Sequence, residues 1–220
     1  MALHWYKDGE VSPHVLCHAH LLYPDKDIIY SESCIEPRGP AHIPVILGSW
    51  ERAERYAKNI IEDVNHFSSG WIDWNLCLDM SGGPNWAGNH VDSPVIINQE
   101  RDEFYLQPMF FIMGHFSKFV PPGSVAVPSW VREWSPDQDQ GTLRTAAFIH
   151  PEGNIVLQLL NIGDEEMEVK VEWGRGTFLH TSIPPRALQT LLLPGGAHED
   201  HGKAKYLSTP DDHCVDNKCN

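Results

Sequence analysis

In the first third of the chain, a short run of apolar residues is followed by apolar residues at helical spacing, and then by a second apolar run. Ile28, Ile29 and Tyr30 form an apolar run that predicts a buried strand of the parallel kind over Asp27–Ser33. After a loop rich in Pro and Gly, Ser49 can cap a helix. The apolar residues of this helix recur on one face: Ala53, Ala57, Ile60, Ile61 and Val64.

The segment that follows predicts a return to the sheet. "SSG" is expected to end the helix at Gly70, and "WIDWNLCL" directly after it has the character of a second strand. A strand, a helix and a strand in this order normally form a right-handed crossover between parallel strands. Farther along, "FYLQPMFFIMGHFSKF" is apolar on most sides, so residues 102–119 are expected to form a second helix that is buried against the sheet.

After "VPPGS" the pattern changes to alternation. "TAAFIHPEGNIVLQLLNIGDEEMEVKVEW" predicts three strands joined by two turns, at Pro-Glu-Gly-Asn and at Gly-Asp. This is antiparallel β-structure and indicates a separate domain of the sandwich type. The last 25 residues, 196–220, are polar and without pattern, so we expect them to be disordered.

The charge of the chain argues against two kinds of binding surface. Its net charge is −14, whereas a nucleic-acid footprint and a basic membrane patch both need clustered Lys and Arg. The 13 histidines would nearly cancel this charge near pH 5, which is compatible with an acidic compartment. No apolar run approaches the roughly 18 residues of a membrane-spanning helix. The opening "MALHWYKDGE" lacks the features of a signal peptide, so the protein is expected to be cytosolic or to lack its true N-terminus.

The five cysteines do not predict a disulfide framework, because their number is odd and their spacing irregular. "HVLCHAH", from His14 to His20, and the tail "HCVDNKC" contain imidazoles and thiols that could bind zinc. Neither has the paired spacing of a zinc knuckle. We therefore predict no metal site and keep metal binding as the weakest hypothesis.

Candidate chemistry lies where the predicted strands end. Glu32 falls at the carboxyl end of the first strand, and Asp73, Trp74 and Asn75 occupy the later part of the next one. In a (β/α)₈ barrel these strand ends form the catalytic face. Flat aromatic rings beside carboxylates and amides suit a sugar, which offers C–H faces and hydroxyls. The alternative is that Glu32 is a solvated loop residue and that the tryptophans belong to the core.

Several contiguous motifs of this sequence resemble one family. "LHWY", "YSESC", "LGSWERAERYAKNII", "GWIDWNLCL", "GGPNW", "NHVDSPVI", "FYLQPMFFIMGHFSKFVPPGS" and "AAFIHPEGNIVLQLLN" occur in this order in the C-terminal half of animal glucosylceramidases, the acid β-glucosidases of glycoside hydrolase family 30. The resemblance covers Ala2 to Leu193. It implies the C-terminal part of a TIM (β/α)₈ barrel over residues 1–119, followed by an antiparallel β-sandwich over residues 120–195.

The resemblance also implies roles for individual residues. Glu32, in Ser-Glu-Ser-Cys, matches the nucleophile of the family's Ser-Glu-Ala-Cys motif, which forms a covalent glycosyl-enzyme. The other matched positions are implied to form the sugar pocket: Trp74 and Asn89, which would contact glucose, Asp73, which would support the same wall, His4 and Tyr6, which would line the pocket around the nucleophile, and Cys34, a free pocket cysteine.

The sequence departs from the family in three respects. His90 replaces a Phe, and Asp63 replaces an Asn on the predicted helix. The third is the motif around the family's acid/base Glu, which does not occur in these 220 residues. Retaining hydrolysis requires two carboxyls about 5 to 5.5 Å apart, and Glu36 and Asp73 are the nearby substitutes. We therefore expect a chain that begins near the sixth barrel strand and is inactive by itself.

Two main hypotheses follow. The first is part of a cofactor-independent glucosylceramidase, which cleaves glucosylceramide or a related β-glucoside to glucose and ceramide. The resemblance then implies a lysosomal location, a saposin-type activator and the lysosomal membrane surface as partners. The alternative is a non-catalytic module that binds a glycolipid or an activator. A continuous upstream reading frame for the missing barrel would discriminate between them.

Overall fold

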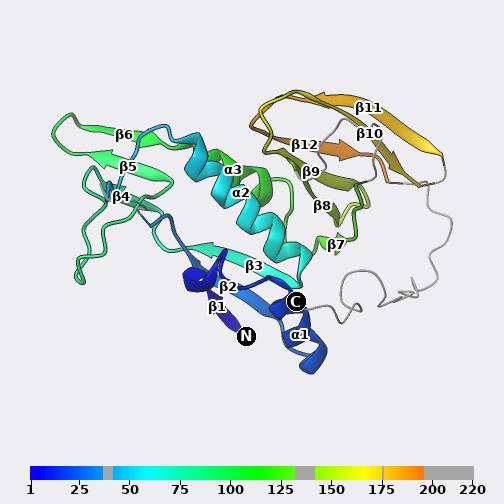
Figure 1. The fold of residues 1–220 in the computed structure, drawn as a ribbon, viewed down its shortest axis with the longest axis horizontal. Coiled ribbons are helices and arrows are strands. Elements are labelled where there is room, and N and C mark those ends of the chain that lie inside the picture. The colour runs from blue at the N-terminus through cyan, green and yellow to red at the C-terminus, as the bar shows by residue number, and fades with distance from the viewer. Residues whose placement is uncertain (37–41, 132–141, 175, 196–220) are drawn as a thin grey trace.

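The protein has two central helices that lie between sheets. The computed structural model describes residues 1–36, 42–131, 142–174 and 176–195. Helices α2 (Trp50–Asn65) and α3 (Pro108–Ser117) lie side by side in the middle of the molecule (Figure 1). A parallel sheet lies on one side of them and a β-sandwich on the other. In the described parts of the chain, no helix combines the length and the apolar character needed to cross a membrane.

The parallel sheet confirms the predicted strand, helix, strand order. Its strands are β1 (Ala2–His4), β2 (Ile28–Ser33) and β3 (Ser68–Asp73), in the spatial order β1-β2-β3. Both pairings are parallel. The 3-10 helix η1 (Trp5–Lys7) and helix α1 (His14–Leu22) connect β1 to β2, and α2 connects β2 to β3. The sheet is therefore built from successive crossover units, as in a (β/α)₈ barrel.

Helix α2 begins as the sequence predicts but ends earlier. The hydroxyl of Ser49 accepts a hydrogen bond from the backbone N–H of Arg52, which caps the helix. The helix ends at Asn65, and Gly70 lies inside β3 rather than at the helix end. The chain reverses at Phe67, which adopts a φ of 69°. The left-handed residue that turns the chain is thus an aromatic one, which the "SSG" motif did not indicate.

A second small sheet corrects two more predictions. Its strands β4 (Cys77–Asp79), β5 (Val95–Asn98) and β6 (Glu103–Leu106) have the order β4-β5-β6. "WIDWNLCL" therefore splits between β3 and β4, and the predicted helix 102–119 gives its first residues to β6. Antiparallel pairing with β5 fixes Glu103–Leu106 as a strand. Pro108 then starts α3, because a helix leaves the N–H of its first residue unused.

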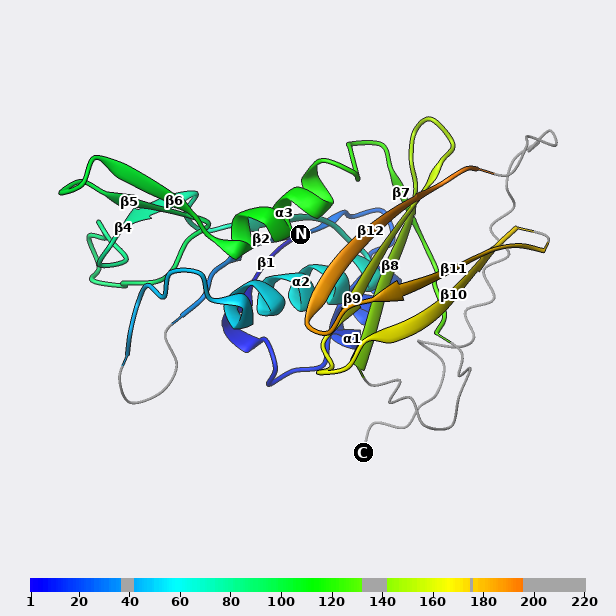
Figure 2. The same cartoon turned by 90° about the horizontal axis from the view of Figure 1, so that it is seen from above.

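The β-sandwich confirms the predicted alternation after "VPPGS". One antiparallel sheet has the order β12-β9-β8-β7, from strands β7 (Val125–Val127), β8 (Leu143–Ile149), β9 (Ile155–Asn161) and β12 (Ala187–Leu193). Strands β10 (Met167–Trp173) and β11 (Thr177–Ile183) form a hairpin that covers this sheet, as Figure 2 shows. The tail 196–220, which we expected to be disordered, lies outside the described residues.

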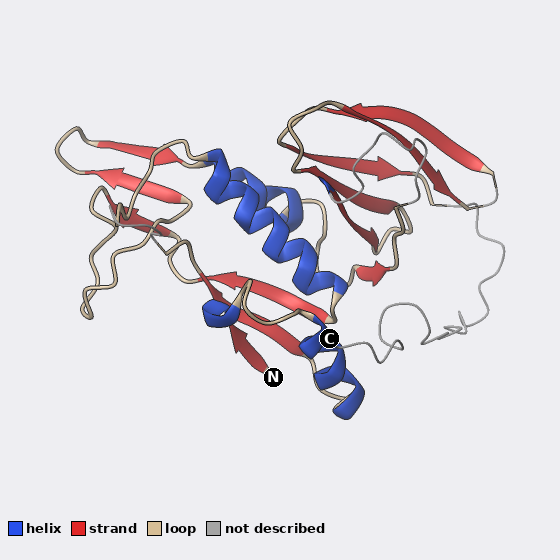
Figure 3. Cartoon of the chain, viewed as in Figure 1, coloured by secondary structure: helices blue, strands red, loops and turns tan. Residues whose placement is uncertain are grey.

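The four-stranded sheet is buried on both faces. On one face Val156 and Leu160 pack with Ala57 and Ile60 of α2 in a single core cluster. On the other face Leu157 and Leu159 join a second cluster with the β10–β11 hairpin. Figure 3 shows the two central helices on one side of this sheet and the hairpin on the other.

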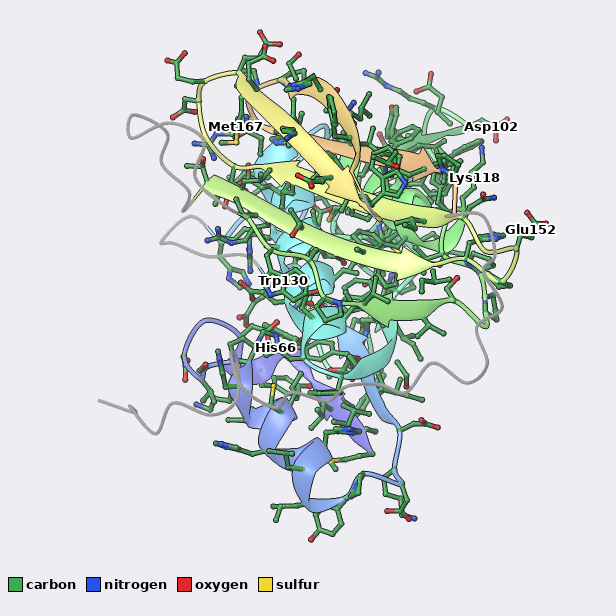
Figure 4. The ribbon with its side chains drawn as sticks, turned by 90° about the vertical axis from the view of Figure 1, so that its right-hand side faces the viewer. His66, Asp102, Lys118, Trp130, Glu152 and Met167 are labelled. Carbon is green, nitrogen blue, oxygen red and sulfur yellow. The ribbon has the colours of Figure 1, made fainter. Side chains whose placement is uncertain are left out.

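Polar contacts also join the helices to the sandwich. Gln158 of β9 donates to the backbone oxygen of His115 in α3 at 2.8 Å and accepts from Thr190 of β12 at 2.6 Å. Asn65, at the end of α2, donates to the backbone oxygen of Thr145 in β8. In Figure 4 the sandwich, marked by Met167 and Glu152, lies above His66 at the end of α2. The barrel part and the sandwich therefore share one apolar interface, and hydrogen bonds also cross it.

Candidate active site

Polar side chains gather at the carboxyl ends of the three parallel strands. His4 of β1 pairs in register with Glu32 of β2, and Ser33 pairs with Asp73 of β3. The register shifts between Leu3 and His4 and again between Tyr30 and Ser33. Such irregularities re-aim side chains next to functional sites.

The carboxylate of Glu32 is held by two neighbours. The hydroxyl of Tyr6 donates to its Oε1 at 2.9 Å, and Nδ1 of His4 lies 3.7 Å from the same oxygen. The side chain of Glu32 is 13% exposed, whereas Tyr6 is well exposed. The hydrogen bond to Glu32 raises the pKa of Tyr6, so this hydroxyl keeps its proton and acts as a donor. Glu32 is thus oriented and still reaches solvent.

Asp73 is engaged from several sides. The hydroxyl of Tyr56 in α2 donates to its Oδ1 at 2.8 Å, and the backbone N–H groups of Trp74 and Asn75 act on the same carboxyl. Burial raises the pKa of Asp73 to about 7 in spite of these bonds. Its Oδ2 is buried, with no hydrogen-bond partner in the described structure. Asp73 therefore holds the turn that carries Trp74 rather than projecting freely.

Trp74 is also fixed through its backbone, because its N–H donates to the backbone oxygen of Ser33 at 2.8 Å. Its side chain stays exposed at the strand ends. Trp71, by contrast, packs against the central core and its Nε1 donates to Asn59. Of these two tryptophans, Trp71 fits the core alternative, and Trp74 has a surface that a sugar could cover.

Cys34 lies just beneath the site. It is buried in a cluster with Leu78, Val91 and Ile96. Burial, with the nearby charges of Asp73 and Glu32, raises the pKa of its thiol to about 12. The thiol therefore stays protonated. Cys34 packs in this apolar cluster and does not act as a nucleophile.

Asn89 belongs to a loop that returns to the site. The amide oxygen of Asn85 accepts from the backbone N–H groups of Ala87 and Asn89, which shapes the loop. The backbone N–H of Asp92 donates to Ile35 at 3.2 Å, which ties the end of the loop to the segment after Glu32. Asn89 is exposed, and the described hydrogen bonds do not join it to Glu32. The structure brings His4, Tyr6 and Glu32 into contact, and the contact of Asn89 with glucose stays a prediction.

Sequence reasoning missed the polar residues behind the strand ends. Tyr56 and Asn59 lie on the buried face of α2 and contact Asp73, Ser33 and Trp71. The sequence contained a signal for them, because polar side chains on the apolar face of an amphipathic helix are usually hydrogen-bonded to buried groups.

The histidines of "HVLCHAH" lie on α1. His20 stacks on Phe67 at 4.1 Å between ring centroids, and His14 contacts the edge of His66 at 5.0 Å. Within residues 1–36, 42–131, 142–174 and 176–195, no three His, Cys, Asp or Glu side chains are grouped as metal ligands. The tail motif "HCVDNKC" lies outside the described residues.

A carboxylate at the carboxyl ends of parallel barrel strands, next to a β-sandwich, is the arrangement of a two-domain glycoside hydrolase. Residues 1–120 match the family model of the glycosyl hydrolase family 30 TIM-barrel domain, and residues 133–191 match that of the family 30 beta sandwich domain. The chain belongs to glycosyl hydrolase family 30.

Curated proteins that are similar to this chain are named as glucosylceramidases. Putative glucosylceramidase 3 of Caenorhabditis elegans is 39% identical over 193 residues, which is 87% of this chain and 35% of that protein. Lysosomal acid glucosylceramidase of Mus musculus is 38% identical over 193 residues, or 87% of this chain and 36% of that protein. The chain thus spans about a third of the length of these relatives.

Solved structures show the same fold. SrfJ from Salmonella typhimurium is 27% identical and superimposes with a TM-score of 0.75 over 88% of this chain and 40% of its own.

Proposed function

We propose that the chain contributes the nucleophile and one wall of the sugar site of a retaining β-glucosidase, which cleaves glucosylceramide or a related β-glucoside. The observation that carries this proposal is Glu32, a largely buried carboxylate at a strand end that accepts a hydrogen bond from Tyr6 at 2.9 Å. A nucleophile needs this combination of orientation and access.

In the proposed reaction, a carboxylate oxygen of Glu32 attacks the anomeric carbon while the bond to the aglycone oxygen breaks. A general acid gives its proton to that oxygen, and ceramide leaves as an alcohol. Water then attacks the glycosyl-enzyme, the same group takes the proton of the water, and Glu32 is released as a carboxylate. Tyr6 and His4 orient Glu32 for the attack.

The general acid is proposed to come from a part of the barrel outside residues 1–220. Asp73 has a pKa of about 7, but its Oδ1 accepts from Tyr56 and its Oδ2 is buried. Glu36 is exposed beyond the end of β2, next to residues that the structure does not describe. Neither arrangement supports proton transfer to a leaving group beside Glu32.

The wider setting is proposed from the relatives. The mouse protein is named a lysosomal enzyme, and a lysosomal location would suit a chain whose 13 histidines nearly cancel its charge near pH 5. Its lipid substrate would lie in a membrane surface, so a saposin-type activator is a proposed partner.

The 220-residue chain alone is expected to show no turnover of a fluorogenic β-glucoside near pH 5, because positioned proton transfer supplies about 10²- to 10⁴-fold. A chimaera that joins the preceding part of the mouse protein to residues 1–220, which we call the completed barrel, is expected to be active. Turnover by the chain alone that disappears in Glu32→Gln would contradict an external acid. A folded completed barrel without turnover would instead favour a non-catalytic binding module.

Replacing Trp74 by Ala in the completed barrel is expected to raise KM and lower kcat together, by about tenfold or more in kcat/KM, because ring stacking both binds and positions the sugar. Steady-state kinetics with a soluble β-glucoside measure this. Trp86→Ala is the matched control, since Trp86 is 99% exposed on the neighbouring loop. If both variants behave like the parent, Trp74 does not contact the sugar.

A further inference from the structure

A buried network of polar side chains centres on Asp92, just before β5. The side chain of Asp92 is 0% exposed. Within the described structure its Oδ2 accepts from Nη1 of Arg52 and from the backbone N–H of Ile46, the latter at 3.2 Å. Its Oδ1 accepts from Nε2 of Gln107 at 2.6 Å and from the backbone N–H of Ser93 at 3.0 Å. We call Asp92, Arg52 and Gln107 the Asp92 network.

The partners of Asp92 are themselves held in place. Arg52, in the first turn of α2, also donates to the backbone oxygens of residues 43 and 44, at 2.8 and 2.6 Å. Oε1 of Gln107, at the junction of β6 and α3, accepts from the backbone N–H of Gly48 at 2.9 Å. Arg52 is 5% exposed and Gln107 is 2% exposed. Polar groups removed from water need their partners, so these bonds favour a single arrangement of the carboxylate of Asp92.

The backbone of Asp92 contacts the segment that follows Glu32. Its N–H donates to the backbone oxygen of Ile35 at 3.2 Å, and the two residues form an isolated antiparallel bridge. Ile35 is buried and lies three residues after Glu32. The backbone oxygen of Ser33 accepts from the N–H of Trp74 at 2.8 Å. The chain directly after Glu32 is therefore held by Trp74 at one point and by Asp92 at the next.

Asp92 also follows the closure of the loop that carries Asn89. The backbone N–H of Val91 donates to the backbone oxygen of Gly82 at 3.3 Å, which closes the loop 82–91. Gly82 has a φ of 80°, and a Cβ there would overlap the backbone oxygen of Val91. The chain can approach itself this closely because residue 82 has no side chain. The base of the loop is thus fixed next to the carboxylate of Asp92.

We propose that Asp92 is a positioning residue of the sugar site, which holds the base of the Asn89 loop against the backbone that follows Glu32. This role rests on the proposed function, in which Glu32 is the nucleophile and Asn89 contacts glucose. Because its side chain is fully buried, Asp92 acts through these neighbours and does not touch the sugar. Apolar residues of similar volume often stabilise a fold as well as a buried ion pair does. What the Asp92 network adds is direction, because its hydrogen bonds define how the two segments lie beside each other.

Two variants of the completed barrel test this role. Gln107→Met keeps a similar volume, removes the hydrogen bonds to Asp92 and Gly48, and leaves no charge unpaired. Asp92→Asn keeps the shape and removes the charge. The rate constant for covalent labelling of Glu32 by a fluorinated β-glucoside near pH 5 is expected to fall about tenfold in Gln107→Met and further in Asp92→Asn, because small misplacements of reacting groups cost up to about 10²-fold. The final amount of label per molecule reports the folded fraction separately.

Leu159→Ala is the control for a general loss of stability. Leu159 is 2% exposed in the cluster between the sandwich sheet and the β10–β11 hairpin. This variant is expected to unfold at a lower urea concentration and still to label Glu32 with the rate constant of the parent. A lower amount of label with unchanged rate constants in both variants of the Asp92 network would overturn the proposal. An equal fall of the rate constant in Leu159→Ala would also overturn it, because destabilisation alone would then be the cause.

Hydrogen exchange of the 220-residue chain tests the anchoring without turnover. The amide of residue 92, which donates to Ile35, is expected to exchange about tenfold faster in Gln107→Met than in the parent chain, beyond any change in the amides of β9. Equal protection of this amide in both proteins would overturn the anchoring, whatever the labelling result. If the parent completed barrel is not labelled at residue 32, the proposed function fails, and this measurement still decides whether the Asp92 network holds the two segments together.

Discussion

Glu32→Gln in the completed barrel is expected to abolish formation of the covalent glycosyl-enzyme, with a loss of turnover of about 10⁴-fold or more. Gln keeps the volume of the side chain and can still accept the hydrogen bond from Tyr6 at Oε1. It lacks the negative charge that attacks the anomeric carbon. Labelling with a fluorinated or epoxide β-glucoside inhibitor, followed by mass spectrometry of the peptide that contains residue 32, measures this result.

Glu36→Gln is the matched control, because Glu36 is an exposed carboxylate four residues farther along the chain. It should be labelled at residue 32 like the parent. Circular dichroism of both variants reports whether the fold is kept. Labelling of residue 32 in the Glu32→Gln protein, or loss of labelling in Glu36→Gln alone, would contradict the assignment.

Asp92→Ala is expected to destabilise the 220-residue chain by about 3 to 5 kcal/mol, because it leaves a buried guanidinium without its counter-charge. The side chain of Asp92 is 0% exposed and that of its partner Arg52 7%. Asp92 also accepts from Nε2 of Gln107 at 2.6 Å and from the backbone N–H of Ile46 at 3.2 Å. This network joins the start of α2 to the segments before β5 and α3. Urea unfolding near pH 5 gives the free energy of unfolding.

The control for this change is Asp25→Ala, which breaks the exposed pair of Asp25 with Lys26. Exposed pairs contribute little to stability, so this variant should unfold like the parent. If Asp92→Ala also unfolds within about 1 kcal/mol of the parent, the backbone oxygens of Ile43 and Pro44, which accept from Arg52, suffice to hold the guanidinium.

The sequence predicted those elements whose signals are local. The apolar spacing of α2 and its Ser49 cap are contained within a few turns of chain, and the structure confirms both. The alternation of Met167–Trp173 likewise predicted strand β10. At Glu103–Leu106 the apolar pattern predicts a helix, whereas the structure has a strand, because antiparallel pairing with β5 outweighs the local pattern.

In the candidate site, too, the features with local signals were predicted and those that depend on long-range contacts were not. The position of Glu32 at a strand end follows from the apolar run before it, and the resemblance to a family gave it a role that stays a prediction. The contact of Tyr56 with Asp73 joins two elements, and that of Asn59 with Asp8 spans about fifty positions of the chain. The helical spacing places Tyr56 and Asn59 on the apolar face of α2, but the groups that they bind depend on how α2 lies on the sheet.

The double-sided burial of strands β8 and β9 bears on how this chain could be engineered. One hydrophobic core includes Phe148, Val156 and Leu160 of the sandwich together with Tyr56 and Ile61 of α2. A cut between the two family domains therefore passes through the middle of that core. A chimaera that takes its sandwich from a relative is expected to fold only if α2 and α3 are taken from the same relative. Heat should melt both parts in one cooperative transition, and a substitution deep in the sandwich should destabilise the barrel part as well.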